Sequence, residues 1–213
     1  DDFFDGKKPK GSSSEKTDLS ANVIDNKISS TIKINYNIKS SLGSPATLLN
    51  ASNNTNFIYK IENIDDRLMN VINSIEGRTK LLDRYKMLKE NCADIKFIKT
   101  ESSIFKNNLE LIDSKLPEIL SKLLILSYSE NEKDIKILMN KLITNETEKN
   151  FYTKKIGDFA NAVTFGMRAG ESWNGINEVN GGIFLVRRTG DIHLLDLIYH
   201  KHLNETETFN EMF

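Results

Sequence analysis

Three polar residues in the N-terminal part of the sequence have side chains that suit phosphodiester chemistry: Asp18, Asn37 and Lys39. Asn37 and Lys39 are two positions apart, so a β-strand there would point both side chains to one face. A neighbouring strand that opens with Asp18 would bring its carboxylate close to them. Carboxylate and amide oxygens bind hard cations, and a lysine can orient a water molecule or stabilise charge on a phosphate. We therefore expect the local chemistry of a metal-dependent phosphodiesterase.

Ile38 has two expected roles in this arrangement. Its side chain is expected to point into the core, opposite to Asn37 and Lys39, and its backbone carbonyl is expected to give the cation a second oxygen beside Asp18. An ordinary alternative exists, because an aspartate before a strand and a lysine at its end are common on solvated sheet edges. Spacing alone does not decide between the two interpretations.

Two alternating segments supply the strands that would position these side chains. Apolar and polar residues alternate along 17–24 and again along 31–39. This period of two is typical of half-buried strands. Asp25-Asn26 between the segments favours a turn. The sequence therefore predicts an antiparallel hairpin.

Several longer stretches carry a resemblance that spans about residues 11 to 213. They are, in order, GSSSEKTD, NIKSSLGSPATLLNAS, TNFIYKI, NLELID, TFGMRAGESWNG and GGIFLVRRTGDI. Together they resemble the HpaII-like type II restriction endonucleases, a branch of the PD-(D/E)xK nucleases. The resemblance implies that Asp18 is the first acidic residue of the nuclease motif and that Lys39 is its lysine.

Position 37 departs from the nuclease pattern, which has Asp or Glu where this chain has Asn. An amide oxygen can still bind a metal ion or a water molecule on the metal, but it brings no negative charge. We therefore expect another carboxylate to complete the site. The candidates are Glu15, Asp25 or a residue upstream of this sequence.

The resemblance also implies an activity and its partners. It implies Mg2+-dependent hydrolysis of double-stranded DNA within CCGG or a similar short palindrome, which leaves a 5′-phosphate. A two-fold symmetric target favours a homodimer. A cognate DNA methyltransferase would share the target site, in a restriction-modification system of the bacterial cytoplasm.

Small polar side chains that follow Lys39 are the first candidates for DNA contact. Amides and hydroxyls of this kind read base edges or bind phosphate, although a polar loop can also satisfy its own backbone. The candidates are Ser40, Ser44, Asn50, Ser52, Asn53, Thr55 and Asn56.

Further along, Arg168, Trp173 and Arg187 are candidate contacts to the DNA groove or backbone. Trp173 has a simpler alternative as a core or rim aromatic residue. Arg187 lies at the tip of a second predicted hairpin, in which an alternating segment at 183–188 turns at Thr189-Gly190 and returns over 192–199.

The composition fits an ordinary globular chain. The 213 residues carry a formal net charge of −1, so any DNA contact must come from a local basic surface. The single cysteine, Cys92, excludes an internal disulfide and suits a reducing cytosol. No apolar run reaches the length of a membrane span. The sequence begins with Asp rather than Met, so we expect a piece of a longer protein.

The expected fold class is α+β, with a mixed nuclease-type β-sheet, a large helical portion and a C-terminal β-hairpin. We expect one domain over 1–213, with the sheet in 1–100, a helical lobe in 101–170, and a hairpin and helix in 171–213. A strand at 57–61 is expected to join the same sheet. Helical spacing predicts helices at about 65–76, 81–91, 102–112, 118–129, 135–143 and 151–166. The helix at 118–129 is apolar around much of its girth and is expected to be deeply buried.

Two other functions stay open. Asn37 favours a DNA-binding module that has lost cleavage. A helical scaffold that binds another protein is more distant from the pattern. The glycine motifs of P-loop and dinucleotide-binding proteins and the GxSxG elbow of hydrolases are absent from the sequence.

Overall fold

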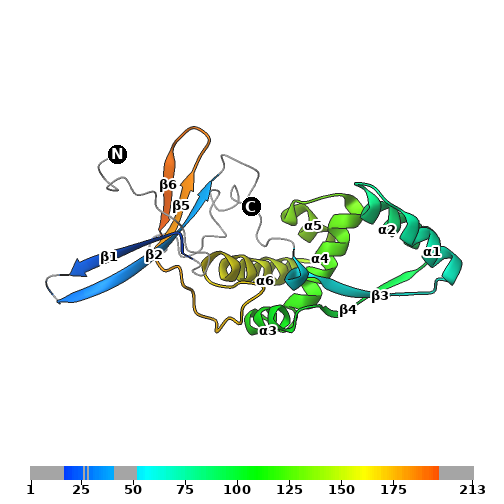
Figure 1. The fold of residues 1–213 in the computed structure, drawn as a ribbon, viewed down its shortest axis with the longest axis horizontal. Helices are drawn as coiled ribbons and strands as arrows, with labels where there is room; N and C mark the ends of the chain where they lie inside the picture. The colour runs from blue at the N-terminus through cyan, green and yellow to red at the C-terminus, as the bar shows by residue number, and fades with distance from the viewer. Residues whose placement is uncertain (1–16, 26, 28, 41–51, 197–213) are drawn as a thin grey trace. The chain divides into compact units, whose positions relative to one another are not determined.

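The computed structural model describes residues 17–25, 27, 29–40 and 52–196, which form helices and strands in two compact units (Figure 1). The first unit contains strands β1, β2, β5 and β6 and the segment Ala160–Met167. The second contains the remaining helices and strands and the segment Arg168–Asn174. The expected α+β class is confirmed, and one domain over the whole chain stays a prediction.

The first unit is built on a four-stranded mixed sheet in the order β1-β2-β5-β6. The hairpin of β1 (Leu19–Asp25) and β2 (Ser30–Ser40) is antiparallel, as predicted. So is the hairpin of β5 (Gly182–Val186) and β6 (Ile192–Asp196). The two hairpins are joined by parallel pairing of β2 with β5. The predicted C-terminal helix near Phe209 lies outside the described residues.

The buried face of β2 is the opposite of the predicted one. Ile38 is 44% exposed, whereas Asn37 is only 3% exposed, so the prediction that Ile38 enters the core is wrong. The parallel register places Asn37 beside Ile183 and Lys39 beside Leu185, and both of these neighbours are buried. The core of this unit therefore lies on the Asn37 face, where the end of helix α6 (Glu146–Phe165) packs.

Asn180-Gly181-Gly182 fits β5 closely against its neighbours. The Asn180 side chain accepts a hydrogen bond from the backbone N–H of Asn35 on β2 at 2.7 Å. Gly182 has φ +138°, and a Cβ built there would lie 2.1 Å from the backbone oxygen of Leu195 on β6. These residues therefore do more than turn the chain, because they allow close approach of the strands on both sides.

The second unit has a separate two-stranded sheet of β3 (Phe57–Glu62) and β4 (Asp94–Thr100). The prediction that 57–61 joins the hairpin sheet is wrong. Aromatic contacts show why β3 stays with β4: Phe97 lies 5.8 Å from Phe57 and 6.0 Å from Tyr59 between ring centroids. Such pairs add stabilisation beyond the area that they bury.

The six predicted helices are confirmed. Polar residues at their first positions explain several starts, since the side chains of Asp65, Ser102 and Asp134 accept hydrogen bonds from the first turn. In the part of the chain that the structure describes, no helix has the length and hydropathy to cross a membrane. Besides α6, the helices are α1 (Asp66–Ser74), α2 (Lys80–Glu90), α3 (Ser103–Ile112), α4 (Leu116–Glu130) and α5 (Ile135–Leu142).

Candidate functional site

Asp18 is positioned by the backbone of β2. Its N–H donates to the Tyr36 oxygen at 3.0 Å, and its Oδ2 accepts from the Ile38 N–H at 2.7 Å. The residue itself is exposed. The carboxylate therefore lies against the edge of β2 at the point where β1 begins, with solvent access for a ligand.

The Ile38 carbonyl lies on the same side of β2 as this carboxylate. In a strand, the N–H and C=O of one residue point to the same side, and the direction alternates from residue to residue. Because the Ile38 N–H donates to Asp18, its carbonyl also faces the β1 side. A carboxylate and a main-chain carbonyl at one edge fit the oxygen ligands that a hard cation takes.

The Asn37 side chain contacts the end of helix α6. Its Nδ2 donates to the Thr164 oxygen at 2.7 Å, in the last turn of α6. Its Oδ1 is buried and has no hydrogen-bond partner among the described residues. The amide at the acidic position of the predicted motif is thus bound to a helix end, a contact that no sequence pattern signals.

Basic residues gather at one end of the sheet. Lys39 is half-buried near the end of β2 and pairs in register with Leu185. Because β5 is parallel to β2, the two strands end at the same edge, and Arg187 and Arg188 follow directly after β5. The predicted Lys39 and Arg187 therefore share one edge of the sheet.

A complete set of metal ligands is not assembled by the described residues. Within 17–40 and 52–196, apart from the undescribed positions 26 and 28, no group of three or more His, Cys, Asp or Glu side chains could hold a metal ion. Asp25 is at the far end of β1 from Asp18, about 20 Å away at ~3.3 Å per residue. Asp25 is therefore too distant to be a further ligand beside Asp18. Glu15 lies outside the described residues.

Comparison with known proteins agrees with the family resemblance of the sequence. The family model described as HpaII restriction endonuclease matches residues 2–212. The chain belongs to the HpaII restriction endonuclease family. It is 39% identical over 196 residues to the type II restriction enzyme HpaII of Haemophilus parainfluenzae, an alignment that covers 89% of this chain and 53% of that enzyme. The chain thus spans about half the length of this HpaII relative. No solved structure gives a significant match.

In this member of the HpaII family, three of the described polar residues before β3 have hydrogen-bond partners within the protein. At the short helix η2 (Asn53–Thr55), the Thr55 hydroxyl accepts from the Ser52 N–H at 3.1 Å and donates to the Ser52 backbone oxygen at 3.0 Å. Asn56 donates to the Glu101 carboxylate at 2.7 Å. DNA contact by these residues and by exposed Asn53 and Ser40 stays a prediction. Ser44 and Asn50 lie outside the described residues.

The segment that carries Arg168 and Trp173 is held by a residue that sequence reasoning missed. Asn108, 2% exposed on α3, donates through Nδ2 to the backbone oxygens of Arg168 and Glu171, both at 2.8 Å. Its Oδ1 accepts from the Trp173 N–H at 3.0 Å. Arg168 also forms an ion pair with Glu171. The loop at 168–173 is therefore held by a side chain of α3. In the sequence, a polar residue on the apolar stripe of that helix was the one feature that could have indicated this contact.

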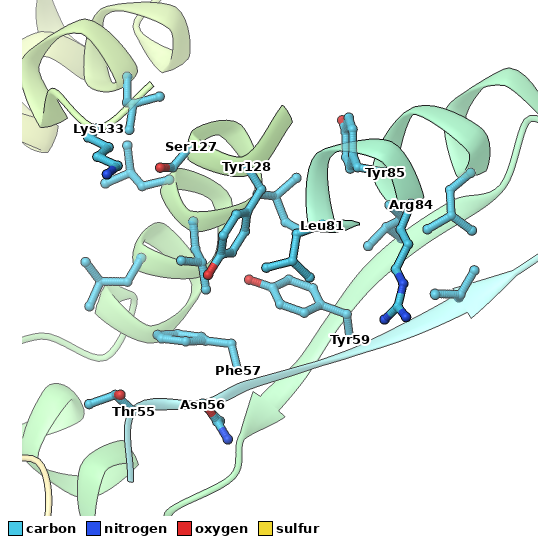
Figure 2. Close-up of a pocket in the computed structure, with 18 of the residues that line it drawn as sticks. Thr55, Asn56, Phe57, Tyr59, Leu81, Arg84, Tyr85, Ser127, Tyr128 and Lys133 are labelled. Carbon is cyan, nitrogen blue, oxygen red and sulfur yellow. The ribbon is translucent and has the colours of Figure 1, made fainter. Parts of the chain in front are cut away.

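A pocket of about 700 Å³ opens in the second unit between the two-stranded sheet and the helices (Figure 2). Leu120, Leu124 and Ile125 line it, so α4 is less deeply buried than predicted. Tyr59 donates to the Ser121 oxygen at 2.9 Å, and burial raises the pKa of its phenol. None of the described residues that line the pocket is acidic, so it lacks the groups that phosphodiester hydrolysis needs.

Proposed function

We propose that this chain is the nuclease part of a type II restriction endonuclease. It would hydrolyse phosphodiester bonds in duplex DNA, at CCGG or a similar short palindrome, within a restriction-modification system. Membership of the HpaII family supports this function. The observation that carries it is the 2.7 Å contact of the Asp18 carboxylate with the Ile38 N–H, which sets two oxygens at one edge of β2.

Each residue of the site has a proposed role. Asp18 and the Ile38 carbonyl would hold Mg2+. When bound, the cation would neutralise charge on the phosphate and favour deprotonation of the attacking water. Lys39 would orient that water or stabilise the developing charge. Asn37 would keep β2 in position, and the arrangement of these groups on a mixed sheet would be of the PD-(D/E)xK type.

The proposed DNA contacts come from a local surface, because the chain as a whole has a net charge of −1. Arg187 at the end of β5 would bind phosphate near Lys39. Arg168, Trp173 and the polar residues around η2 stay proposed contacts to the groove or backbone. A palindromic site would be bound by a homodimer, and a methyltransferase would protect the same sequence in the bacterial cytoplasm.

Plasmid cleavage tests this function directly. The parent protein is expected to linearise a CCGG-containing plasmid with Mg2+ and to leave it intact with EDTA. The cleavage rate of Lys39→Ala is expected to be lower than that of the parent by a factor of about 100 or more, because one group that stabilises the transition state is removed. Equal cutting by Lys39→Ala and the parent would remove Lys39 from the mechanism.

A DNA-binding module without cleavage is the second candidate. Asn37 favours it, since the amide brings no negative charge and is engaged with Thr164. This function predicts a shifted CCGG duplex on a gel and no cleavage with Mg2+, Mn2+ or Ca2+. Cleavage with any of these cations would exclude it.

A further inference from the structure

The C-terminal end of α6 needs hydrogen-bond donors. The last four carbonyls of an α-helix have no partner within the helix. Two of them are satisfied here by neighbouring segments: the Phe165 oxygen accepts from the Val179 N–H at 2.9 Å, and the Thr164 oxygen accepts from Asn37 Nδ2 at 2.7 Å. Asn37 is therefore a cap for a helix that is distant in sequence.

The contact is closed to solvent. Asn37 is 3% exposed and Thr164 is 2% exposed. A buried carbonyl that loses its donor is costly, because water does not replace the lost partner. The orientation of the amide also follows, because only the NH2 group of Asn37 can donate to a carbonyl. Its Oδ1 is then left buried, with no hydrogen-bond partner in the part of the chain that the structure describes.

A carboxylate at position 37 would not fit this environment. Ionised Asp has acceptors only, so it would face the Thr164 carbonyl with no proton to donate. The C-terminal end of a helix also carries partial negative charge, which repels an anion. The space that Asn fills would accommodate Asp, so the barrier to an acid is electrostatic rather than steric.

We propose that Asn37 is a positioning residue whose amide caps α6 and thereby sets the Asp18–Ile38 contact, and that an acid at position 37 would weaken the site. Ile38 is the next residue along β2 and makes the contact with Asp18. A shift of β2 at position 37 therefore moves the Ile38 N–H and carbonyl together. The departure from the acidic motif is then a requirement of the fold and not a lost metal ligand. The cleavage part of this inference rests on the proposed function, whereas its stability part does not.

Two substitutions test the cap by thermal unfolding. Asn37→Asp keeps the shape of the side chain and removes the donor, and Asn37→Leu removes the donor without adding charge. Both are expected to lower the unfolding midpoint by about 3 °C or more, with Asp the lower of the two. Asn22→Asp is the matched control, since Asn22 is exposed on β1 opposite Lys33 and should keep the midpoint of the parent.

Thermal unfolding in Ca2+ distinguishes a helix cap at position 37 from a lost metal ligand there. Under the proposal, 5 mM Ca2+ raises the midpoint of Asn37→Asp no more than that of the parent. A larger Ca2+ shift in Asn37→Asp, or an unchanged midpoint without Ca2+, would overturn the proposal. If Asn37→Asp does not fold, Asn37→Leu decides: a lowered midpoint supports the cap, and the midpoint of the parent contradicts it.

The Mg2+ concentration that gives half-maximal cleavage is a readout that simple loss of folded protein does not change. In Asn37→Leu, the Mg2+ concentration for half-maximal rate is expected to rise at least threefold, because the Ile38 carbonyl and Asp18 are displaced. Loss of folded protein would lower only the maximal rate, and that result would reject the positioning role. Faster cleavage by Asn37→Asp than by the parent would also reject it. If the parent does not cleave, the proposed function fails, and the midpoints still test the cap.

Discussion

Asp18 is held in place by contacts with the main chain of β2, so its position follows the position of that strand. Its N–H and its carboxylate both contact β2, at 3.0 Å and 2.7 Å. A residue fixed in this way is preorganised for a ligand, because little side-chain freedom remains to be lost on binding. The charge of Asp18, rather than its contact with Ile38, is therefore the property that a substitution should test.

Asp18→Asn is expected to reduce Mg2+-dependent cleavage at least about 100-fold. The amide oxygen of Asn can still accept from the Ile38 N–H, so the fold should be kept while the negative charge is lost. DNA affinity in EDTA should stay the same or rise, because a charge near the phosphates is removed. Cleavage rates and gel-shift affinities check both expectations.

Glu76→Gln is the matched control, because it also removes the charge of an exposed acid. Glu76 lies between α1 and α2, away from the β1–β2 hairpin in the sequence. This control should cleave as fast as the parent. Asp18→Asn within threefold of the parent would show that Asp18 does not bind the cation.

The individual elements depend on a few close contacts that can be tested by stability. At the start of β5, Gly182 has a left-handed backbone, and its missing side chain leaves room for β6. Between α3 and α6, Asp113 and Lys155 form an ion pair with side-chain exposures of 19% and 24%. One contact joins strands and the other joins helices.

Gly182→Ala is expected to destabilise the protein by about 3 kcal/mol or more, because strain at positive φ adds to a clash. The new Cβ would lie 2.1 Å from the Leu195 backbone oxygen, which cannot easily move within β6. Gly77→Ala is the control, since Gly77 has φ +106° with nothing within 4 Å of a built Cβ. It should cost only about 1 kcal/mol. Equal urea midpoints for the two variants would contradict the packing of β5 on β6.

Asp113→Asn is expected to destabilise the protein by about 1 kcal/mol at pH 7. The hydrogen bond from Lys155 holds the pKa of the Asp113 carboxyl below its ordinary value of 3.8. A lowered pKa adds stability above the ordinary value, and this stability is lost as the pH falls through the folded-state pKa. The difference between variant and parent should therefore be constant from pH 7 to about pH 5 and shrink towards pH 3.

Urea unfolding at several pH values measures this difference. Glu146→Gln serves as the control, because its ion pair with Lys149 is exposed and should contribute little at any pH. A difference for Asp113→Asn that grows as the pH falls would show that the pair does not stabilise the ionised carboxyl.

Sequence periodicity was sufficient to predict the helices and both hairpins, but not their assembly. Alternation along β2 shows that Asn37 and Ile38 face opposite sides, yet it does not show which side is buried. That choice is made by β5 and α6, which follow more than 100 positions later. The separate sheet of β3 and β4 depends likewise on contacts across the fold.

For the site, types and spacing of residues were sufficient to propose Asp18 and Lys39. The links of Asn37 to Thr164 and of Asn108 to the loop at 168–173 were not predictable, because each joins an amide to main-chain atoms of a distant segment. A backbone partner leaves no pattern of residue types in the sequence. Such amides are found only when the fold is known.

At the scale of the whole molecule, the chain is a nearly neutral protein with its proposed chemistry at one sheet edge. The net charge of −1 gives no general attraction to DNA. Lys39, Arg187 and Arg188 supply local positive charge where β2 and β5 end, near the oxygens of Asp18 and Ile38 in the same sheet. Phosphate binding by these basic residues and cleavage would therefore use the same end of the first unit.

A crystal structure with a CCGG duplex and Ca2+ is the most direct test. We predict a Ca2+ ion about 2.3–2.6 Å from a carboxylate oxygen of Asp18 and from the Ile38 carbonyl oxygen. A phosphate of the duplex should share the ion, with Lys39 beside it. Duplex bound at another surface, with no cation at Asp18, would contradict the account.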